Sequence, residues 1–345
     1  MTTIMKKSDE RSLLIIVVDV SPVIWNVRDM RRSKSDESRF AKGKPSAGPA
    51  TLQECLKSIQ AFSGAFCGLQ RGCSIMIIAV AGNESAIVFP RKRSLHDFFR
   101  EGKIDLRMLQ DHLATGVAEL ISRKGAAEDT ACMAAGLSLA LCNINRFLVA
   151  NNCGVAALSA ENSLQFQKDG DDGIDSVMGD AKPRKTQKAG ALSPRILVVQ
   201  ASNDRSNDYN AFMNCAFAAI KHNIVIDGCF IPSGIGRDAK NSSFLEQACD
   251  RAGGVYLAPS GMAQVGASLT EILFSIFLAP LSARKNLNLP AINKVDFRAR
   301  CFETGETTNM AYVCNQCLSI FKNCPSNTCP TCGANILKKK DQTSS

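Results

Sequence analysis

The stretch Leu13-Leu14-Ile15-Ile16-Val17-Val18-Asp19 is a continuous apolar run that ends in a carboxylate. A short run of this kind is typical of a β-strand that is buried on both faces, as in a parallel sheet. The turn Asp19-Val20-Ser21-Pro22 follows at the carboxyl end of that strand, where open α/β sheets bind their ligands. The stretch therefore predicts both a central strand and the edge of the sheet at which a site is expected.

Working outward from this strand, apolar runs alternate with helical periodicity along most of the chain. Further strands are expected at residues 74–80, 85–89, 195–200, 224–230 and 254–257. Helices are expected at residues 106–121, 131–147, 209–220, 243–252 and 265–278, with another starting at the capping box of Thr51 and Glu54. Gly82-Asn83 predicts a hairpin-like, antiparallel connection between the second and third strands. Repeated β-α units predict an α/β fold with a doubly wound, mainly parallel sheet and helices on both faces.

Two polar stretches, Arg28–Ala50 and Ser159–Ser193, interrupt this pattern. They lack apolar periodicity, so we expect disordered insertions there. The expected organisation is a tail at residues 1–12, an α/β domain at 13–283, a linker at 284–309, a cysteine-rich module at 310–337 and a basic tail at 338–345.

Composition limits the class of protein. The chain has 345 residues, of which 45% are hydrophobic and 21% charged, enough for one large globular domain with small appendages. The apolar run Leu13–Val18 is too short for a signal sequence, and no run approaches the roughly 20 apolar residues of a membrane helix. Fifteen cysteines without a secretory signal favour reduced thiols and a metal site. The net charge of +9 is a weak indication of an anionic partner, because much of the excess lies in the polar stretches.

The cysteines near the end of the chain have the spacing of a zinc site. Cys314 and Cys317 form one C-x-x-C pair, and Cys329 and Cys332 form a second pair after eleven intervening residues. Each such turn places two thiolates close enough to bind one ion, and tetrahedral Zn²⁺ takes four donors. These four cysteines are therefore the predicted ligands of a structural zinc ion.

The second of the two turns has the more favourable sequence. Pro330 fixes φ inside the turn, and Gly333 directly after it can adopt the positive φ that folds the backbone back towards the sulfurs. Cys324 lies between the two pairs and is a fifth thiol that can compete for the metal.

Several segments together resemble a known family. The order of elements, the Asp19-x-Ser21 turn and the antiparallel third strand look like a von Willebrand factor A-type domain. The more specific likeness is to the smaller A-domain subunit of the general transcription factor TFIIH. It is carried by Phe212-Met213-Asn214, Ile224-Val225-Ile226-Asp227, Gln247-Ala248-Cys249-Asp250, Gly253-Gly254-Val255-Tyr256-Leu257, Tyr312-Val313-Cys314 and Cys317-Leu318-Ser319-Ile320-Phe321.

This resemblance implies a structural subunit of the TFIIH core that acts in the nucleus, in RNA polymerase II transcription initiation and nucleotide excision DNA repair. The implied partners are other core subunits, especially the larger subunit that combines an A-type domain with zinc-binding modules. Contact with DNA would be indirect, through the complex, and neither a membrane nor a small-molecule substrate is implied.

A-type domains also suggest a cation site at the sheet edge. The wider superfamily uses Asp-x-Ser-x-Ser, a Thr from a second loop and an Asp from a third, and Asp19, Ser21, Thr130 and Asp204 match these positions. The second Ser is replaced by Val23, which supplies no oxygen to a hard cation such as Mg²⁺. The alternative is that Asp19 and Ser21 cap neighbouring backbone amides.

Two classes of function remain after enzymes are considered. We expect no enzyme, because none of the three histidines lies in a hydrolase motif and no phosphate-binding loop occurs. The alternative to a scaffold subunit is a free-standing, zinc-containing nucleic-acid-binding protein. Between Cys314 and Cys332 there is one Lys, no Arg and one Phe, with apolar Leu318, Ile320 and Phe321, which favours packing on protein over phosphate contact.

Overall fold

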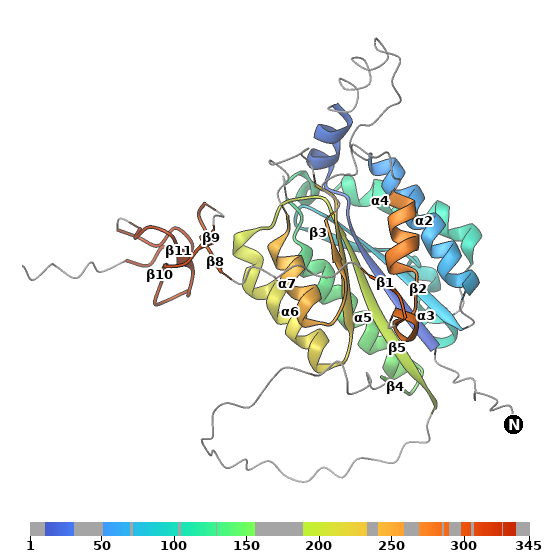
Figure 1. Ribbon diagram of the computed structural model, residues 1–345. Helices are drawn as coiled ribbons and strands as arrows, with labels where there is room; N and C mark the ends of the chain where they lie inside the picture. Colours follow the sequence, from blue (N-terminus) through green and yellow to red (C-terminus); the bar gives the residue numbers. More distant parts are fainter. Residues whose placement is uncertain are drawn as a thin grey trace, which may run out of the picture.

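The computed structural model describes most of the chain as an α/β domain followed by a small cysteine-rich module (Figure 1). The described residues are 11–30, 51–69, 72–102, 105–128, 130–155, 189–232, 241–258, 269–284, 286–289, 298–304, 307–325 and 327–335. The predicted fold class is confirmed.

A seven-stranded sheet forms the centre of the domain, in the order β3-β2-β1-β5-β6-β7 with β4 beside β5. The strands are β1 (Arg11–Asp19), β2 (Cys73–Ala81), β3 (Glu84–Phe89), β4 (Cys153–Val155), β5 (Ala189–Gln200), β6 (Val225–Phe230) and β7 (Tyr256–Leu257). Every pair is parallel except β2 and β3, which are antiparallel as predicted. Gly82 in the turn between them has a φ of 54°, a conformation that glycine adopts without strain.

Helices cover both faces of this sheet (Figure 1). The described helices are residues 22–30, α2 (Leu52–Leu69), α3 (Lys92–Glu101), α4 (Leu106–Ile121), α5 (Met133–Ala150), α6 (Tyr209–Lys221), α7 (Ser243–Arg251), α9 (Leu269–Ile272) with its π-helical continuation η5 (Leu273–Phe277), and α10 (Leu281–Arg284). Two short 3-10 helices, η1 (Lys124–Ala127) and η3 (Ser206–Asp208), lie in loops. One layer contains α3, α5, α6 and α7, and the other contains residues 22–30, α2, α4, α9 and η5.

The position of β1 at the centre of the sheet, between two helical layers, explains why its sequence is apolar without interruption. In β1, Leu13, Ile15 and Val17 pack against the layer of α5, while the alternate side chains pack against the layer of α2. All of the side chains from Leu13 to Val18 are at most 1% exposed. Both faces of the strand are thus buried, as the sequence predicted.

Helix α5 approaches the sheet closely because Gly136 lacks a side chain. A Cβ atom at this position would lie 2.6 Å from Val80 and 2.7 Å from Val17. Among the described helices, α5 is also the one long and apolar enough to cross a membrane by length and composition. The buried face of α5 lies in the hydrophobic core of the domain. A helix at the centre of a packed layer is equally apolar, so burial in the core accounts for the composition of α5.

The predicted boundaries of the two insertions are wrong at one end of each, where the structure has a helix or a strand. Residues 28–30 continue a helix, and Arg28 in it is fully buried, with its guanidinium donating to the carbonyl oxygen of Ala201 at 3.0 Å. Residues 189–193 belong to β5, where the backbone pairs with β4 and β1. The rest of both insertions, residues 31–50 and 159–188, lies outside the described residues.

Three described cysteines of the domain are small core side chains. Cys55, Cys229 and Cys249 are fully buried, and burial raises the pKa of the Cys229 thiol to about 12. Cys142 differs, because its side chain on α5 is exposed.

A buried ionic network attaches the C-terminal helices to the sheet. Both oxygens of Asp227 on β6 accept from the guanidinium of Arg284, each at 2.7 Å, and Arg195 Nε lies 3.6 Å from Asp227 Oδ2. The carboxylate also accepts the Val255 N–H at 2.9 Å, while Arg195 donates to the Phe277 carbonyl at 2.8 Å. Burial lowers the pKa of Arg195 to about 10 and Asp227 opposes this effect, so the guanidinium stays charged at neutral pH. One carboxylate thus balances two buried cations.

Candidate metal centre and the carboxyl edge of the sheet

Two turns of the same construction bring the paired cysteines together. In the first turn, the N–H of Cys314 donates to the carbonyl of Ser319 at 2.9 Å, and the N–H of Leu318 donates back to Cys314 at 2.9 Å. In the second turn, Cys329 and Gly333 take the same roles, with distances of 2.8 and 2.9 Å. The residue after each pair has a positive φ, 60° at Leu318 and 72° at Gly333. The role predicted for Gly333 is confirmed, whereas the strained φ of Leu318 has no signal in the sequence.

The four sulfurs of these turns converge on one point. Cys314 Sγ lies 3.8 Å from Cys332 Sγ, Cys317 Sγ lies 3.6 Å from Cys329 Sγ, and all four lie within 4.8 Å of one another. A tetrahedral zinc ion with Zn–S bonds of about 2.3 Å separates its sulfurs by about 3.8 Å. The spacing therefore fits a single tetrahedral ion. Within the described residues, this is the one group of three or more His, Cys, Asp or Glu side chains arranged to hold a metal.

The surroundings of Cys317 favour its thiolate. Its Sγ lies 3.1 Å from the Ser319 hydroxyl, and hydrogen bonding to that side chain, followed by the Ser319 backbone, lowers the pKa of Cys317 to about 6. A thiol with a lowered pKa is more readily deprotonated, and the thiolate is the form that binds metals.

Cys324 lies apart from the four converging sulfurs. Its thiol is exposed and contacts the carbonyl of Pro325 at 3.6 Å. The structure therefore does not bring this fifth thiol into the candidate centre.

The module around the cysteines extends into the range predicted as a linker. The strands β10 (Tyr312–Val313) and β11 (Ile320–Phe321) form one hairpin, and β8 (Ala299–Arg300) and β9 (Thr307–Thr308) form another. Between β8 and β9, Phe302 packs against buried Phe321 and donates its N–H to the Ile320 carbonyl at 2.7 Å. The ring of Phe302 also meets that of Tyr209 on α6, with centroids 6.3 Å apart. Residues 298–304 and 307–309 thus form part of the module.

At the carboxyl edge of the sheet, Asp19 is fully buried and its carboxylate is occupied by backbone amides. Oδ1 accepts the N–H of Ser21 at 3.0 Å, and Oδ2 accepts those of Ala201 at 3.1 Å and Ser202 at 2.6 Å. This is the capping role that the sequence left open for Asp19. The Ser21 hydroxyl does not share it, because its buried Oγ has no hydrogen-bond partner.

The other two superfamily positions lie on loops at the same edge. Ser202 donates its N–H to Asp19, and the Gln200 side-chain amide donates to the Ser202 carbonyl at 3.0 Å. Asp204 accepts the Phe244 N–H at the start of α7 and the Gln200 side-chain amide, each at 3.2 Å. Beside Thr130, the Ala131 N–H donates to Ser202 Oγ at 3.2 Å. The polar side chains at this edge of the sheet therefore form internal hydrogen bonds, which join the loops to one another and to the N-terminus of α7.

A buried cation lies at the same edge. The guanidinium of Arg28 donates to the carbonyls of Ala201, Ile231 and Pro232 and lies 5.1 Å from the Trp25 ring centroid. Burial raises the pKa of the Cys55 thiol, and the charge of Arg28 acts in the opposite direction. A positive side chain in this position opposes the binding of a further cation.

The strand order, the single antiparallel hairpin and the two helical layers define a von Willebrand factor A-type domain, here joined to a four-cysteine module. The family described as Transcription factor Tfb4 matches residues 11–333. The chain belongs to this family.

Individual relatives agree with the family. The chain is 28% identical over 338 residues to the general transcription and DNA repair factor IIH subunit TFB4 of Arabidopsis thaliana, covering 95% of this chain and 89% of that protein. It is 37% identical over 150 residues to the general transcription factor IIH subunit 3 of Dictyostelium discoideum, which covers 44% of this chain and 37% of that protein. Among solved structures, the TFIIH p34 N-terminal domain aligns with 74% of this chain and 96% of its own, at 20% identity and a TM-score of 0.48.

Proposed function

We propose that this chain is a non-catalytic structural subunit of the TFIIH core that acts in transcription initiation and nucleotide excision repair. The observation that carries the proposal is the family match over residues 11–333, which spans both the A-type domain and the four-cysteine module. Relatives aligned over nearly their whole length are named as subunits of a general transcription and DNA repair factor. We propose that the protein acts in the nucleus, where these processes occur.

Zinc is the proposed metal of the four-cysteine centre, held by Cys314, Cys317, Cys329 and Cys332. The spacing of the sulfurs supports this assignment, and four thiolates leave a tetrahedral ion no open position for a substrate. The ion would therefore stabilise the module, which has a small core around Phe321, and would take no part in catalysis.

The proposed mode of action is direct protein–protein contact. The module exposes Met310, Tyr312, Val313 and Leu318, with exposed fractions of 85%, 56%, 57% and 68%. Apolar and aromatic side chains of this kind suit packing on another protein better than contact with phosphate. They favour the scaffold over a free-standing nucleic-acid-binding protein. The proposed partners are the other core subunits, especially the larger one with an A-type domain and zinc-binding modules.

Purification of the tagged chain from nuclease-treated nuclear extract tests the proposal. We expect the other TFIIH core subunits to co-purify in fixed ratio, identified by mass spectrometry, because protein contacts survive removal of nucleic acid. Recovery of the chain alone, or of subunits whose yield falls after nuclease treatment, would contradict it.

A further inference from the structure

Two half-buried cysteines meet where α2 ends and β2 begins. Cys67 lies in the last turn of α2, and Cys73 is the first residue of β2. Along β2, the side chains of Cys73, Ile75 and Ile77 alternate onto the face of the sheet that α2 covers, and Cys67 packs against the same hydrophobic cluster. Gly72, directly before β2, has a φ of 76°, which glycine adopts without strain. The two thiols are hydrogen-bonded to each other.

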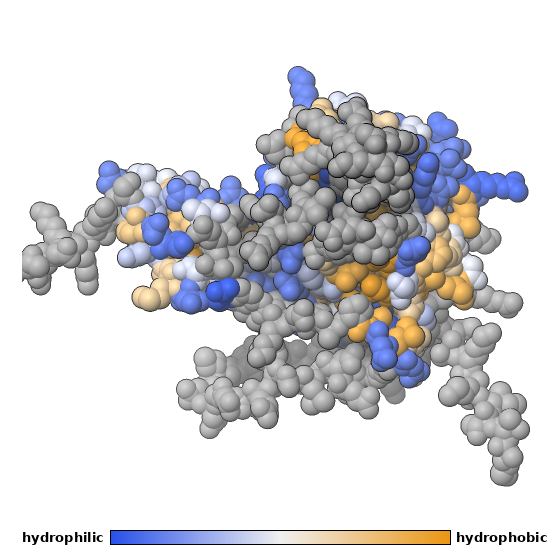
Figure 2. All heavy atoms as spheres, turned by 45° about the horizontal axis from the view of Figure 1, so that its top comes forward, coloured by the Kyte–Doolittle hydropathy of each residue, from blue (hydrophilic) through white to orange (hydrophobic). Residues whose placement is uncertain are grey.

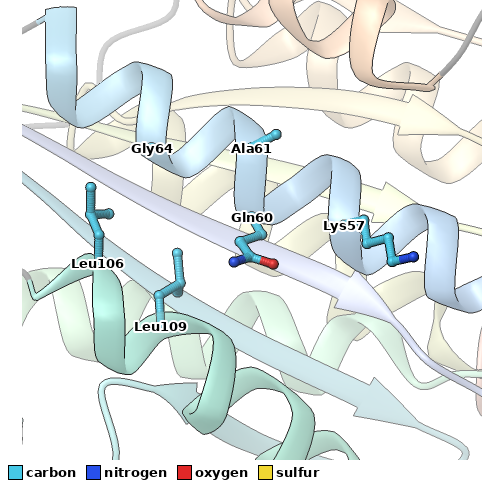
Figure 3. A pocket seen from close by; sticks show the side chains of 6 residues that line it. All are labelled: Lys57, Gln60, Ala61, Gly64, Leu106 and Leu109. Carbon is cyan, nitrogen blue, oxygen red and sulfur yellow. The ribbon is translucent and has the colours of Figure 1, made fainter.

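A small molecule has access to this pair of thiols. Both side chains are partly exposed, whereas Cys55 and Cys229, which also act on one another, are 0% exposed. A Cβ atom added at Gly68, the neighbour of Cys67, would meet nothing within 4 Å. Gly64, one turn earlier on α2, also has open space beside it (Figure 3). The surface next to Cys67 is therefore open, and a small oxidant reaches the pair without opening the fold.

The surroundings of the pair give the two thiols different roles. The hydrogen bond between them, with Cys67 as the donor, lowers the pKa of Cys73 and raises that of Cys67. Cys67 also lies at the C-terminal end of a helix, where the partial negative charge disfavours a thiolate. Residues 58–70 contain no Lys or Arg to offset this effect, and hydrophobic side chains gather on the side of the molecule where α2 lies (Figure 2). Cys73 is therefore the more readily formed thiolate.

We propose that Cys67 and Cys73 are a site of reversible oxidation, at which a hydroperoxide such as hydrogen peroxide converts the two thiols to a disulfide. The Cys73 thiolate attacks one peroxide oxygen and the O–O bond breaks, which leaves a sulfenic acid on Cys73. The departing hydroxide takes up the proton that Cys73 has released and becomes water. The Cys67 thiol then attacks the Cys73 sulfur, the S–O bond breaks, and the second hydroxide leaves with the Cys67 proton as water.

The two thiols lose two electrons in this sequence and the peroxide gains them, so no further reactant is needed. A dithiol reductant reverses the change by thiol–disulfide exchange. The disulfide would join the end of α2 to the start of β2. The proposal goes beyond the proposed function and does not depend on it, because the pair belongs to the A-type domain and is separate from the four-cysteine centre (Figure 1).

Peptide mapping of the oxidised chain tests the proposal. The reduced, zinc-loaded, full-length chain is treated with a small excess of hydrogen peroxide, its remaining thiols are blocked with N-ethylmaleimide, and it is digested with trypsin without reduction. Cleavage after Lys57, Arg71 and Arg91 places the two cysteines in separate peptides, residues 58–71 and 72–91, with one cysteine each. We expect these two peptides to be linked to each other, the link to be removed by dithiothreitol, and the zinc content to stay unchanged.

Single variants separate the roles of the two thiols. In Cys67→Ser the reaction should stop at the sulfenic acid of Cys73, which dimedone labels. In Cys73→Ser, dimedone labelling of Cys67 should be at least about fivefold lower, because its thiolate is disfavoured. Cys142→Ser, which removes an exposed thiol of α5, should leave the yield of the linked peptides unchanged. Thermal unfolding of each variant identifies any loss of fold.

Several results would overturn the proposal. These are the absence of the linked pair under conditions that oxidise the exposed Cys142 thiol, a main product in which either peptide is linked to a different cysteine, or a linked pair that forms only after the chain is unfolded in urea. Equal dimedone labelling of folded Cys67→Ser and Cys73→Ser would overturn the roles assigned to the two thiols.

Discussion

Replacing Asp227 with alanine should lower the free energy of unfolding by about 3–5 kcal/mol, which is typical when one member of a buried ionic network is removed. The Asp227 side chain is fully buried, and those of its partners Arg195 and Arg284 are 5% and 9% exposed. Without the carboxylate, two cations remain buried without that counter-charge, and the Val255 N–H loses its acceptor. Urea unfolding of the full-length chain with zinc saturating measures the change.

Two control variants separate the charge from the loss of atoms. Asp227→Asn keeps an acceptor for the Val255 N–H but removes the charge, so it should destabilise the fold nearly as much as alanine does. Asp250→Ala, at an exposed residue near the end of α7, should change the free energy of unfolding by no more than about 0.5 kcal/mol. A loss below about 1 kcal/mol in Asp227→Ala would show that the network does not hold the C-terminal helices to the sheet.

Replacing Cys332 with serine should abolish stable zinc binding. The purified natural chain should contain close to one zinc ion per molecule, and a missing thiolate opens a closed tetrahedral site. Structural zinc contributes of order 10 kcal/mol to the folding of small modules, so the variant module should also unfold. Elemental analysis of the protein after dialysis against a weak chelator measures zinc content, and protease resistance reports the fold of the module.

Cys324→Ser is the matched control for the metal centre. Its thiol is exposed and lies outside the group of four sulfurs, so this variant should keep its zinc. If Cys324→Ser released the metal and Cys329→Ser retained it, the ligand assignment would be wrong.

Much of the fold could be predicted because local signals agreed with the tertiary structure. The unbroken apolar run Leu13–Val18 indicated a strand buried on both faces, and Gly82-Asn83 indicated the antiparallel pair within the central sheet. At the candidate metal centre, the cysteine spacing and Gly333 indicated two similar turns whose sulfurs lie together. In each case, the local residue pattern is compatible with few other structures.

Other features depend on contacts that the sequence does not reveal. Arg28 looked like the start of a polar insertion, but it is buried because carbonyl oxygens from distant loops accept its N–H groups. Residues 189–193 form part of β5 because neighbouring strands pair with them, although their composition gave no such signal. Phe302 looked like part of a linker, and its partners Phe321 and Tyr209 lie far away in the sequence.

We propose that the A-type domain is a platform for protein contacts that needs no divalent cation at its sheet edge. Asp19 accepts three backbone N–H groups there, Val23 supplies no oxygen and Arg28 is a buried cation nearby. The most direct measurement is the affinity of the zinc-loaded chain for the larger A-domain subunit of TFIIH, with and without Mg²⁺, for the natural chain and for Asp19→Ala and Thr130→Ala. Equal affinity of the natural chain in both conditions, with any loss in a variant matching its loss of stability, is the predicted result. A Mg²⁺-dependent affinity that disappears in Asp19→Ala would contradict the account.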